Sequence, residues 1–343
     1  MKILITGNLG YIGSVLTPLL EKEGYTVKGL DCGFYNDDLL CEQKEPSEQL
    51  IKDIRKVNET DIQDTKIIIH LAGLSNDPLG ELDSNLTRDI NYNSTVNLAK
   101  MAKRVGVEKF IYSSSQSMYG ISQTSNELDE DESEKNPLTE YGKTKWESEQ
   151  KIFELADSKF IVSALRFSTV FGGSPRLRSD IVFNNFLLNA FYNKKINIKS
   201  DGTPWRPVLH VQDACNSIIA CIKAPKNIIN KQAFNVGILN GNYRVKDLAE
   251  VAKKLVPESD IIYTNEHGKD SRTYKVNFKK ILSVLGEYYK PKYNLETGGQ
   301  ELIDFFKKIN VKNKEILLRK TTRLVKLKYL RNLNKINKEL YFE

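Results

Sequence analysis

Short apolar runs alternate with longer amphipathic stretches through the first half of the chain. Residues 1–6 read MKILIT, an apolar run of strand length, and residues 14–24 read SVLTPLLEKEG, which has helical spacing of apolar positions and ends on a glycine. Repeated strand–helix units of this kind predict an α/β fold, with a doubly wound parallel sheet of the Rossmann type and ligands at the carboxyl ends of the strands. Further runs of strand length are YTVKGLD (25–31), KIIIHLA (66–72), FIYSSS (110–115) and IVSALRF (161–167).

Three glycines occupy the turn between the first predicted strand and the first predicted helix. Gly7, Gly10 and Gly13 allow a tight turn, a close approach of the backbone to a pyrophosphate, and close packing at the positive end of a helix. Their G-x-x-G-x-x-G spacing differs from the G-x-G-x-x-G of many dehydrogenases, so an ordinary βα turn is the alternative for the triplet alone. The other turn residues expected to contact the cofactor are Leu9, Tyr11 and Ile12.

Asp31 ends the second predicted strand, within the roughly 20-residue distance at which an acid can accept the hydroxyls of the adenosine ribose. A carboxylate at this place repels a 2′-phosphate, so NAD is favoured over NADP. The alternative is that Asp31 only starts a turn. Residues at the ends of the next two strands are expected to flank the bound cofactor: Asp53, Ile54, Leu71, Ala72 and Gly73.

Composition agrees with a soluble α/β enzyme. The 343 residues can bury a sizeable core, as one large domain or two interleaved ones. No apolar run approaches the roughly 20 residues that span a bilayer. The N-terminal MKILITG is already a strand rather than a signal peptide, so a cytoplasmic location is expected. No metal site or disulfide framework is expected, because the cysteines form no C-x-x-C pair and have no histidine cluster: Cys32, Cys41, Cys215 and Cys221.

Tyr141 and Lys145 lie four residues apart in TEYGKTKWESEQ and share one helical face. A tyrosine with a pKa near 10 is a poor base at neutral pH, and an adjacent ammonium would lower that pKa. The same lysine could hold a nicotinamide ribose, although this spacing also occurs by chance on many helices. Ser115 ends the strand FIYSSS and is the candidate partner of a substrate hydroxyl or carbonyl; a strand-end turn serine is the alternative.

Taken in order, these motifs resemble the extended short-chain dehydrogenase/reductases that act on nucleotide sugars, typified by UDP-galactose 4-epimerase and dTDP-glucose 4,6-dehydratase. The resemblance covers residues 1–305 and implies that Ser115, Tyr141 and Lys145 form the catalytic triad. Tyr141 would take the proton from a sugar hydroxyl while hydride passes to the nicotinamide. Asn91 would match the structural asparagine of the family, and Asn91, Tyr141 and Lys145 are also counted among the NAD contacts. The motifs that carry the resemblance are TGNLGYIG, Asp31, KDIR, HLAG, Asn91, SSSQSMYG, YGKTK, LRF, WRPVLHVQD and FNVG.

The chain departs from the family pattern at two places. Sugar 4,6-dehydratases carry an acidic pair directly after the serine or threonine of the triad, where this chain has Gln116 and Ser117. Neither side chain can act as a carboxylate, so dehydration is disfavoured. Ser168 and Thr169 replace an asparagine that often follows the LRF strand, and these shorter side chains could still bond a phosphate.

The resemblance also implies a smaller domain that grips a nucleotide diphosphate. We expect an NAD-binding domain over residues 1–172 with a return segment at about 205–225, and an interleaved substrate-binding domain over residues 173–310. The FNVG motif is expected to lead the chain back to the smaller domain. Arginines suit a diphosphate because of their forked donors. Arg206 matches the phosphate-binding arginine of the family, although Pro207 replaces its usual aspartate, and Arg272 is the expected second clamp. The expected substrate contacts are Ser115, Thr169, Asn184, Arg206 and Arg272; for Asn184, Arg176 and Arg178 a solvated surface position is the alternative.

The last predicted segment, residues 311–343, is strongly basic. From Lys312 onward, ten basic residues against three acidic ones give a net charge of +7, which equals that of the entire chain. Its apolar positions predict a basic amphipathic helix that could pack on the body or a second subunit, bind an acidic partner, or lie on an anionic membrane. Nucleic acid is not an expected partner, since stacking aromatics are few. The apolar positions are Leu317, Leu324, Leu327, Leu330, Leu333, Ile336 and Leu340.

The sequence therefore predicts an NAD-dependent nucleotide-sugar epimerase that removes and returns hydride, at C4, through a transient keto sugar. A nucleotide-sugar dehydrogenase or 4-ketoreductase with the same triad is an alternative. A non-catalytic NAD-binding sensor is another, against which the retention of all three triad residues argues. The family resemblance further suggests a homodimer built on the helix of Tyr141, and a place in surface polysaccharide assembly.

Overall fold

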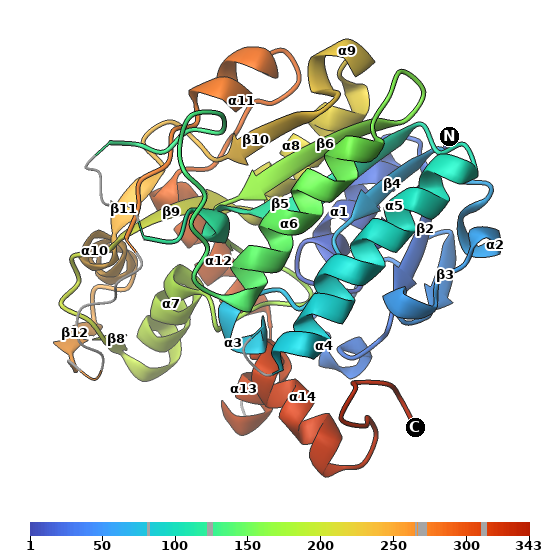
Figure 1. Cartoon of the computed structure of the whole chain (residues 1–343). Helices are drawn as coiled ribbons and strands as arrows, with labels where there is room; N and C mark the ends of the chain where they lie inside the picture. The colour runs from blue at the N-terminus through green and yellow to red at the C-terminus, as the bar shows by residue number, and fades with distance from the viewer. Residues whose placement is uncertain (81–82, 122–125, 265, 267–272, 310–313) are drawn as a thin grey trace.

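The computed structural model describes residues 1–80, 83–121, 126–264, 266, 273–309 and 314–343. Within these ranges the centre of the molecule is a seven-stranded sheet in the order β10-β6-β5-β4-β1-β2-β3 (Figure 1). Every neighbouring pair in it is parallel, which confirms the predicted α/β fold. Its strands are β1 (Lys2–Thr6), β2 (Thr26–Asp31), β3 (Glu48–Ile51), β4 (Ile67–His70), β5 (Lys109–Ser115), β6 (Ile161–Phe167) and β10 (Gln232–Val236).

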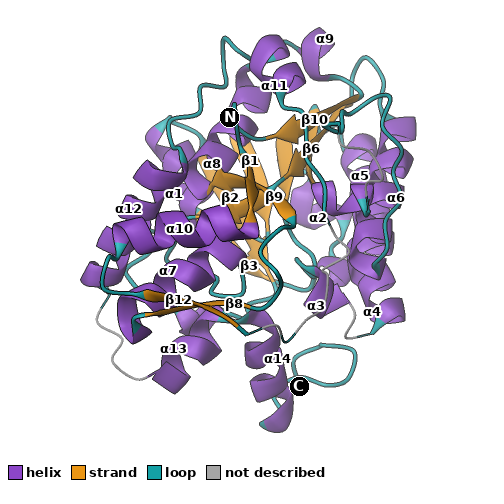
Figure 2. Cartoon of the chain, turned by 90° about the vertical axis from the view of Figure 1, so that its left-hand side faces the viewer, coloured by secondary structure: helices purple, strands orange, loops and turns teal. Residues whose placement is uncertain are grey.

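Both faces of the sheet are buried, as the near-continuous apolar runs of a parallel sheet require. In β1, Ile3 and Ile5 point into one core and Leu4 into the other, and all three are fully buried. Helices α1 (Gly13–Lys22) and α8 (Val211–Lys223) pack on the first face. Helices α5 (Ser94–Arg104) and α6 (Glu140–Leu155) pack together over the second face (Figures 1 and 2). Short helices in the connections are α2 (Glu59–Ile62), α3 (Asp77–Gly80), α4 (Ser84–Arg88), α9 (Lys226–Ile229) and α11 (Lys279–Val284).

A second, smaller group of elements stands beside the carboxyl ends of the central strands. Helices α7 (Val182–Asn193), α10 (Val245–Leu255) and α12 (Leu295–Lys308) pack on one another. Two small sheets accompany them: β7 (Thr169–Phe171), β9 (Trp205–His210) and β11 (Asn242–Arg244) form one, and β8 (Lys195–Ile198) with β12 (Asp260–Tyr263) forms the other.

After β9 the chain returns to the central sheet through α8, α9 and β10. After β9, helix α8 packs against α1, in keeping with the expected return near residues 205–225. The FNVG motif was expected to lead the chain back to the smaller domain, and the chain does pass from it to β11 of the smaller group. Phe234, Asn235 and Val236 belong to β10, which pairs with β6 at the edge of the central sheet. Phe234 is fully buried there, so the apolar alternation serves the large core.

The basic segment at the end of the chain packs on the body. It forms α13 (Lys314–Thr321) and α14 (Arg323–Asn332), which are separated by Thr322 in an extended conformation, rather than one continuous helix. Side-chain bonds to Ser179 from Thr321 (2.7 Å) and with Thr322 (3.0 Å) hold this break against the body. Most of its apolar positions are buried, several in the core shared with β2: Leu317, Leu327, Leu330, Ile336 and Leu340.

Among the described helices, none combines the length and the apolarity that crossing a bilayer requires.

Candidate functional site

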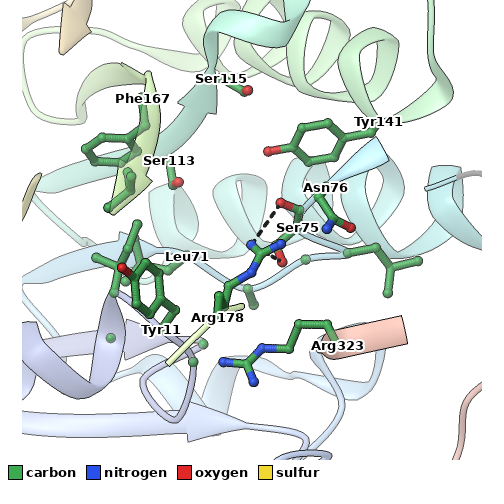
Figure 3. Close-up of a pocket in the computed structure, with 18 of the residues that line it drawn as sticks. Tyr11, Leu71, Ser75, Asn76, Ser113, Ser115, Tyr141, Phe167, Arg178 and Arg323 are labelled. Atoms are coloured by element: carbon green, nitrogen blue, oxygen red, sulfur yellow. Dashed lines mark hydrogen bonds between the residues drawn. The ribbon is translucent and has the colours of Figure 1, made fainter. Parts of the chain in front are cut away.

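A cavity of about 450 Å³ opens at the carboxyl ends of the central strands (Figure 3). Its walls come from the loops after β1, β2, β4, β5 and β6, the start of α6, and the smaller group of elements. The structure thus brings together residues that the sequence predicted separately from distant motifs. The predicted residues that line it are Gly7, Gly10, Tyr11, Ile12, Gly13, Asp31, Asp53, Ile54, Leu71, Ala72, Gly73, Ser115, Tyr141, Lys145, Thr169 and Arg206.

The glycine turn at one end of the cavity has no room for side chains. Gly7 has φ +76°, and a Cβ on Gly7 would lie 2.8 Å from the Ala72 nitrogen. A Cβ on Gly13 would lie 2.4 Å from the Gly7 carbonyl oxygen. Helix α1, ten residues long, starts here behind Ile12, whose side chain makes no cap bond, and the residues of its N-terminus, Tyr11, Ile12 and Gly13, line the cavity. This arrangement fits the diphosphate of a dinucleotide.

Asp31 stands at the end of β2 with both carboxylate oxygens held by backbone. The Leu9 N–H donates to Oδ2 at 3.2 Å and the Gly33 N–H donates to Oδ1 at 2.8 Å. Burial raises the pKa of Asp31, and these N–H groups partly offset that rise. A carboxylate has about four acceptor positions, so capacity remains for ribose hydroxyls. Leu9 acts only through its backbone, because its side chain is buried outside the cavity.

Ser115 and Tyr141 lie at the other end of the cavity (Figure 3), and Lys145 lines the cavity beside Tyr141. Thr139 caps α6 by accepting from the Gly142 N–H at 3.2 Å, which places Tyr141 and Lys145 on the first turns of the helix. Ser115 is close enough to Tyr141 to influence its pKa, and the Ser115 hydroxyl itself donates to the Ser117 hydroxyl at 3.1 Å. The Lys145 Nζ donates to the carbonyl of Ser113 at 2.7 Å and lies 5.9 Å from the centre of the Tyr141 ring.

The electrostatics of this group differ from the sequence-based expectation. We expected Lys145 to lower the pKa of Tyr141, but burial raises the pKa of Tyr141 to about 12, and the neighbouring Ser115 only partly offsets this rise. Burial also lowers the pKa of Lys145 to about 7. The physical reason is desolvation: both groups lie inside the protein, and the ammonium is directed at a carbonyl oxygen rather than at the phenol.

Three predicted contacts have other surroundings. Asn91 accepts from the Leu74 N–H at 2.8 Å and donates to its carbonyl at 3.0 Å, so it fixes the loop after β4 and does not line the cavity. Asn184 donates to the Tyr11 hydroxyl at 3.2 Å and accepts from the Gly172 N–H at 3.0 Å; it is fully buried and also lies outside the cavity lining. Arg272 lies outside the described residues.

The cavity is also lined by residues that the sequence analysis did not propose or left open as surface residues. Arg178 was left open as a surface residue, but it lines the cavity, forms an ion pair with Asp180 at 2.8 Å and donates to the Ser75 hydroxyl at 3.2 Å. Asn76 donates to Asp180 at 2.8 Å. The polar run Ser75, Asn76 and Asp77 directly after HLAG could have indicated this wall. Arg323 from the C-terminal segment lines the cavity as well, and no motif indicated it.

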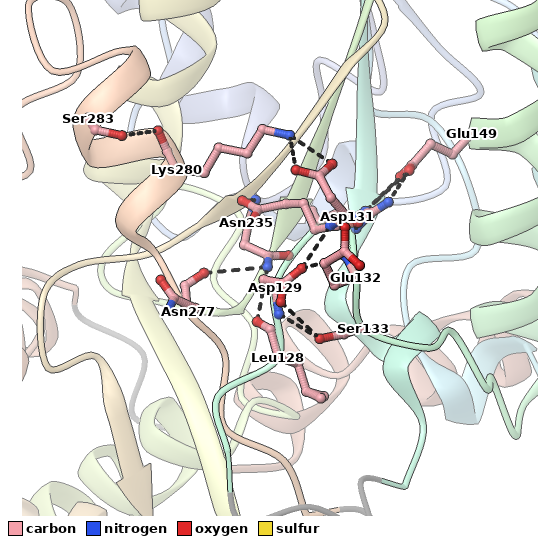
Figure 4. Close-up of polar contacts among 12 residues, drawn as sticks. Leu128, Asp129, Asp131, Glu132, Ser133, Glu149, Asn235, Asn277, Lys280 and Ser283 are labelled. Carbon is pink, nitrogen blue, oxygen red and sulfur yellow. Dashed lines mark hydrogen bonds and ion pairs between the residues drawn. The ribbon is translucent and has the colours of Figure 1, made fainter.

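A buried polar network supports the strand that carries Ser115. Ser114 donates to Glu149 at 2.6 Å, and Glu149 forms a fully buried ion pair with Arg166 at 2.6 Å. The other side of Arg166 donates to the Tyr119 hydroxyl and to the Glu130 carbonyl, both at 3.0 Å. This network continues through the loop of Leu128–Ser133 (Figure 4). The network therefore holds residues 114–119 in place through buried contacts behind the wall of the cavity.

Comparison with known proteins agrees with this architecture. The model of the NAD dependent epimerase/dehydratase family matches residues 3–237. A UDP-glucose 4-epimerase of Lactobacillus helveticus is 30% identical over 320 residues, which cover 85% of this chain and 93% of the relative. UDP-glucuronic acid decarboxylase 1 of Xenopus tropicalis is 25% identical over 316 residues, covering 90% of this chain and 72% of the relative.

The fold is shared with solved structures of more distant sequence. The structure of MoeE5 in complex with UDP-glucuronic acid and NAD has a TM-score of 0.78 at 22% identity, and the match covers 90% of this chain and 99% of that one. Because the two relatives named above carry out different reactions, the choice of reaction depends on the side chains of the cavity itself.

Proposed function

Since the chain belongs to the NAD-dependent epimerase/dehydratase family, we propose that it is a nucleotide-sugar epimerase that inverts C4. The observation that carries this proposal is the group of Ser115, Tyr141 and Lys145 at one end of a cavity whose other end suits a dinucleotide. NAD, when bound, supplies the acceptor and donor of hydride.

In this proposal Tyr141 is the residue that transfers the proton. The Tyr141 side chain, in its phenolate form and beside Ser115, takes the proton of the sugar C4 hydroxyl to become the phenol, and gives this proton back after the keto sugar has turned. Ser115 orients the oxygen at C4. Lys145, fixed by the Ser113 carbonyl, is proposed to donate to the cofactor ribose. Arg206 and Thr169 line the cavity on the side of the smaller group of elements and are proposed to hold the diphosphate of the substrate.

The side chains next to Ser115 favour epimerisation over dehydration. Elimination of water requires a positioned acid and base, and residue 116 is a glutamine in this chain. The Gln116 amide donates to the carbonyls of Arg166 at 3.0 Å and Val236 at 3.3 Å. It is therefore held in the core as a structural group. Ser117 donates its backbone N–H to the Ser115 hydroxyl at 3.1 Å and offers no carboxylate.

The proposal is tested by incubating the purified protein with UDP-, GDP-, CDP- and dTDP-sugars, with and without added NAD. Product stereochemistry is read by NMR and NADH by absorbance in the same samples. An isomer inverted at C4 without net NADH is the expected result. Stoichiometric NADH with a keto or acid product would identify a dehydrogenase and contradict the proposal.

A further inference from the structure

The C-terminal segment, residues 314–343, contributes one side chain to the cavity. Arg323 begins α14, is 2% exposed, and lines the cavity together with Tyr11, Tyr35 and Arg178 (Figure 3). The family model ends at residue 237. Arg323 therefore lies outside the residues that the family model matches.

The charge of Arg323 is less completely compensated than that of its neighbours. Within the described part of the chain, Arg178 is paired with Asp180 and Lys326 with Asp38, each at 2.8 Å, whereas Arg323 has no carboxylate at ion-pair distance. Its Nη2 donates to the Arg176 carbonyl at 2.7 Å.

The rest of the Arg323 guanidinium faces the cavity wall. Its Cζ lies 4.3 Å from the centre of the Tyr35 ring. Among the described residues its Nη1 has no hydrogen-bond partner. Burial lowers the pKa of Arg323, whereas Asp180 raises that of Arg178 against the effect of burial. A buried cation with an unused donor is costly unless an anion completes it.

The position of Arg323 indicates which anion this is. The Tyr11 hydroxyl donates to the Gly172 carbonyl at 2.7 Å, and the Ser174 hydroxyl donates to the Tyr11 carbonyl at 2.9 Å. The loop from Gly172 to Arg176 is thereby attached to the glycine turn. Arg323 bonds to this same loop through the Arg176 carbonyl. Its guanidinium and the glycine turn thus line the same cavity and are both attached to the loop of Gly172–Arg176.

We propose that Arg323 is a cofactor-binding residue, whose guanidinium donates to a diphosphate oxygen of the dinucleotide held at the N-terminus of α1. A guanidinium has the forked donors that suit a diphosphate. A 2′-phosphate is the less suitable anion, because Asp31 occupies the ribose end. The proposal depends on the NAD dependence of the family and is independent of the sugar reaction proposed above.

The test compares Arg323→Met with Lys328→Met in the full chain after bound nucleotide has been removed. Lys328 lies on the same helix and is exposed, so its variant removes an equal charge away from the cavity. Calorimetric titrations with NAD, adenosine and UDP give three affinities for each protein. Arg323→Met is expected to weaken NAD about tenfold or more and to leave adenosine and UDP unchanged, while Lys328→Met leaves all three unchanged.

Other outcomes overturn the assignment. An NAD affinity equal to that of the unsubstituted chain would show that Arg323 makes no cofactor contact. Weakened UDP binding with unchanged NAD binding would place the guanidinium at the diphosphate of the sugar nucleotide. If Arg323→Met does not unfold cooperatively, Arg323→Gln, which keeps a polar side chain, is titrated instead and judged by the same results. No sugar turnover is measured, so a failure of the proposed epimerisation does not affect the result.

Discussion

Tyr141 and Lys145 are both biased toward their neutral forms by burial in the same cavity. Burial raises the pKa of Tyr141 to about 12 and lowers that of Lys145 to about 7. In solution the two groups would titrate close to one another, near 10. Desolvation in the cavity therefore moves the two pKa values apart. A charged ligand that enters the cavity acts strongly on both groups, because little water screens them.

Replacing Tyr141 by Phe removes the ionisable hydroxyl and little else. We expect turnover to fall by at least about a hundredfold, which is the scale of a lost general acid–base group. The affinity for NAD, measured by calorimetry, should change little. Activity equal to that of the unsubstituted protein would remove Tyr141 from the proposed mechanism.

Replacing Lys145 by Met tests the desolvation of the ammonium through stability. The folded-state pKa of Lys145 is below its value in the unfolded chain, so the folded state carries the full cost of a buried charge below pH 7 and loses that cost as pH rises toward 10.5. Lys145→Met should therefore raise the melting temperature of the NAD-free protein by about 3 °C or more at pH 6, and by less at pH 10. Lys143→Met, an exposed position on the same helix, is the control. A pH-independent difference would contradict the assignment.

At the scale of secondary-structure elements, the fixed geometry of β5 and α6 depends on one buried ion pair. Glu149 on α6 contacts both Ser114 on β5 and Arg166 on β6, so it joins three elements behind the candidate catalytic group. Glu147, two residues earlier on α6, pairs with Arg88 at 2.7 Å, but its side chain is 40% exposed. Both are ion pairs between a glutamate and an arginine, but the Glu149 pair is buried and the Glu147 pair is exposed to solvent.

Alanine substitution should separate these two pairs. Glu149→Ala leaves a buried guanidinium without its partner, and we expect a loss of about 3–5 kcal/mol in the free energy of unfolding. Glu147→Ala should lose at most about 1 kcal/mol. Urea unfolding of both variants measures the difference. Equal losses would mean that the buried pair adds nothing beyond a surface contact.

Elements formed by local patterns were predictable from the sequence, and contacts between distant segments were not. The glycine turn, Asp31 and the Tyr141–Lys145 spacing each depend on residues close in sequence, and the structure brings them to one cavity. The place of β10 beside β6 was not predicted, because its apolar alternation does not reveal which sheet accepts the strand. Arg323 was missed because its place depends on how α14 docks, which no local motif encodes.

For the whole molecule, the C-terminal segment joins the first third of the chain in one core. Leu327 and Leu330 are buried with Phe34 and Ile54, and Phe342 lies against Phe34 with ring centres 5.5 Å apart. Since Phe34 and Ile54 also line the cavity, the segment supports the wall on the proposed adenosine side. Binding of the cofactor and docking of the segment are then expected to stabilise each other.

Loosening the docking should speed exchange of the cofactor. Leu327→Ala is expected to cost about 2–5 kcal/mol of stability through its cavity and to increase the rate at which bound NAD exchanges with isotope-labelled NAD. Leu248→Ala on α10 removes an equally buried leucine from the other core. It should lower stability to a similar extent without changing the exchange rate. Equal exchange rates in the two variants would show that docking of the C-terminal segment does not control how long NAD stays bound.

The docking of residues 314–343 also has a consequence for synthesis. Residues near Phe34 leave the ribosome long before α14, and N-terminal parts of a chain generally fold first. Their apolar surface stays exposed to solvent until Leu327 and Leu330 have been synthesised. A chaperone that binds apolar segments is expected to bind this patch before α14 has been synthesised and to be displaced from it once α14 has docked. The wall of the cavity is therefore complete only after translation has passed α14.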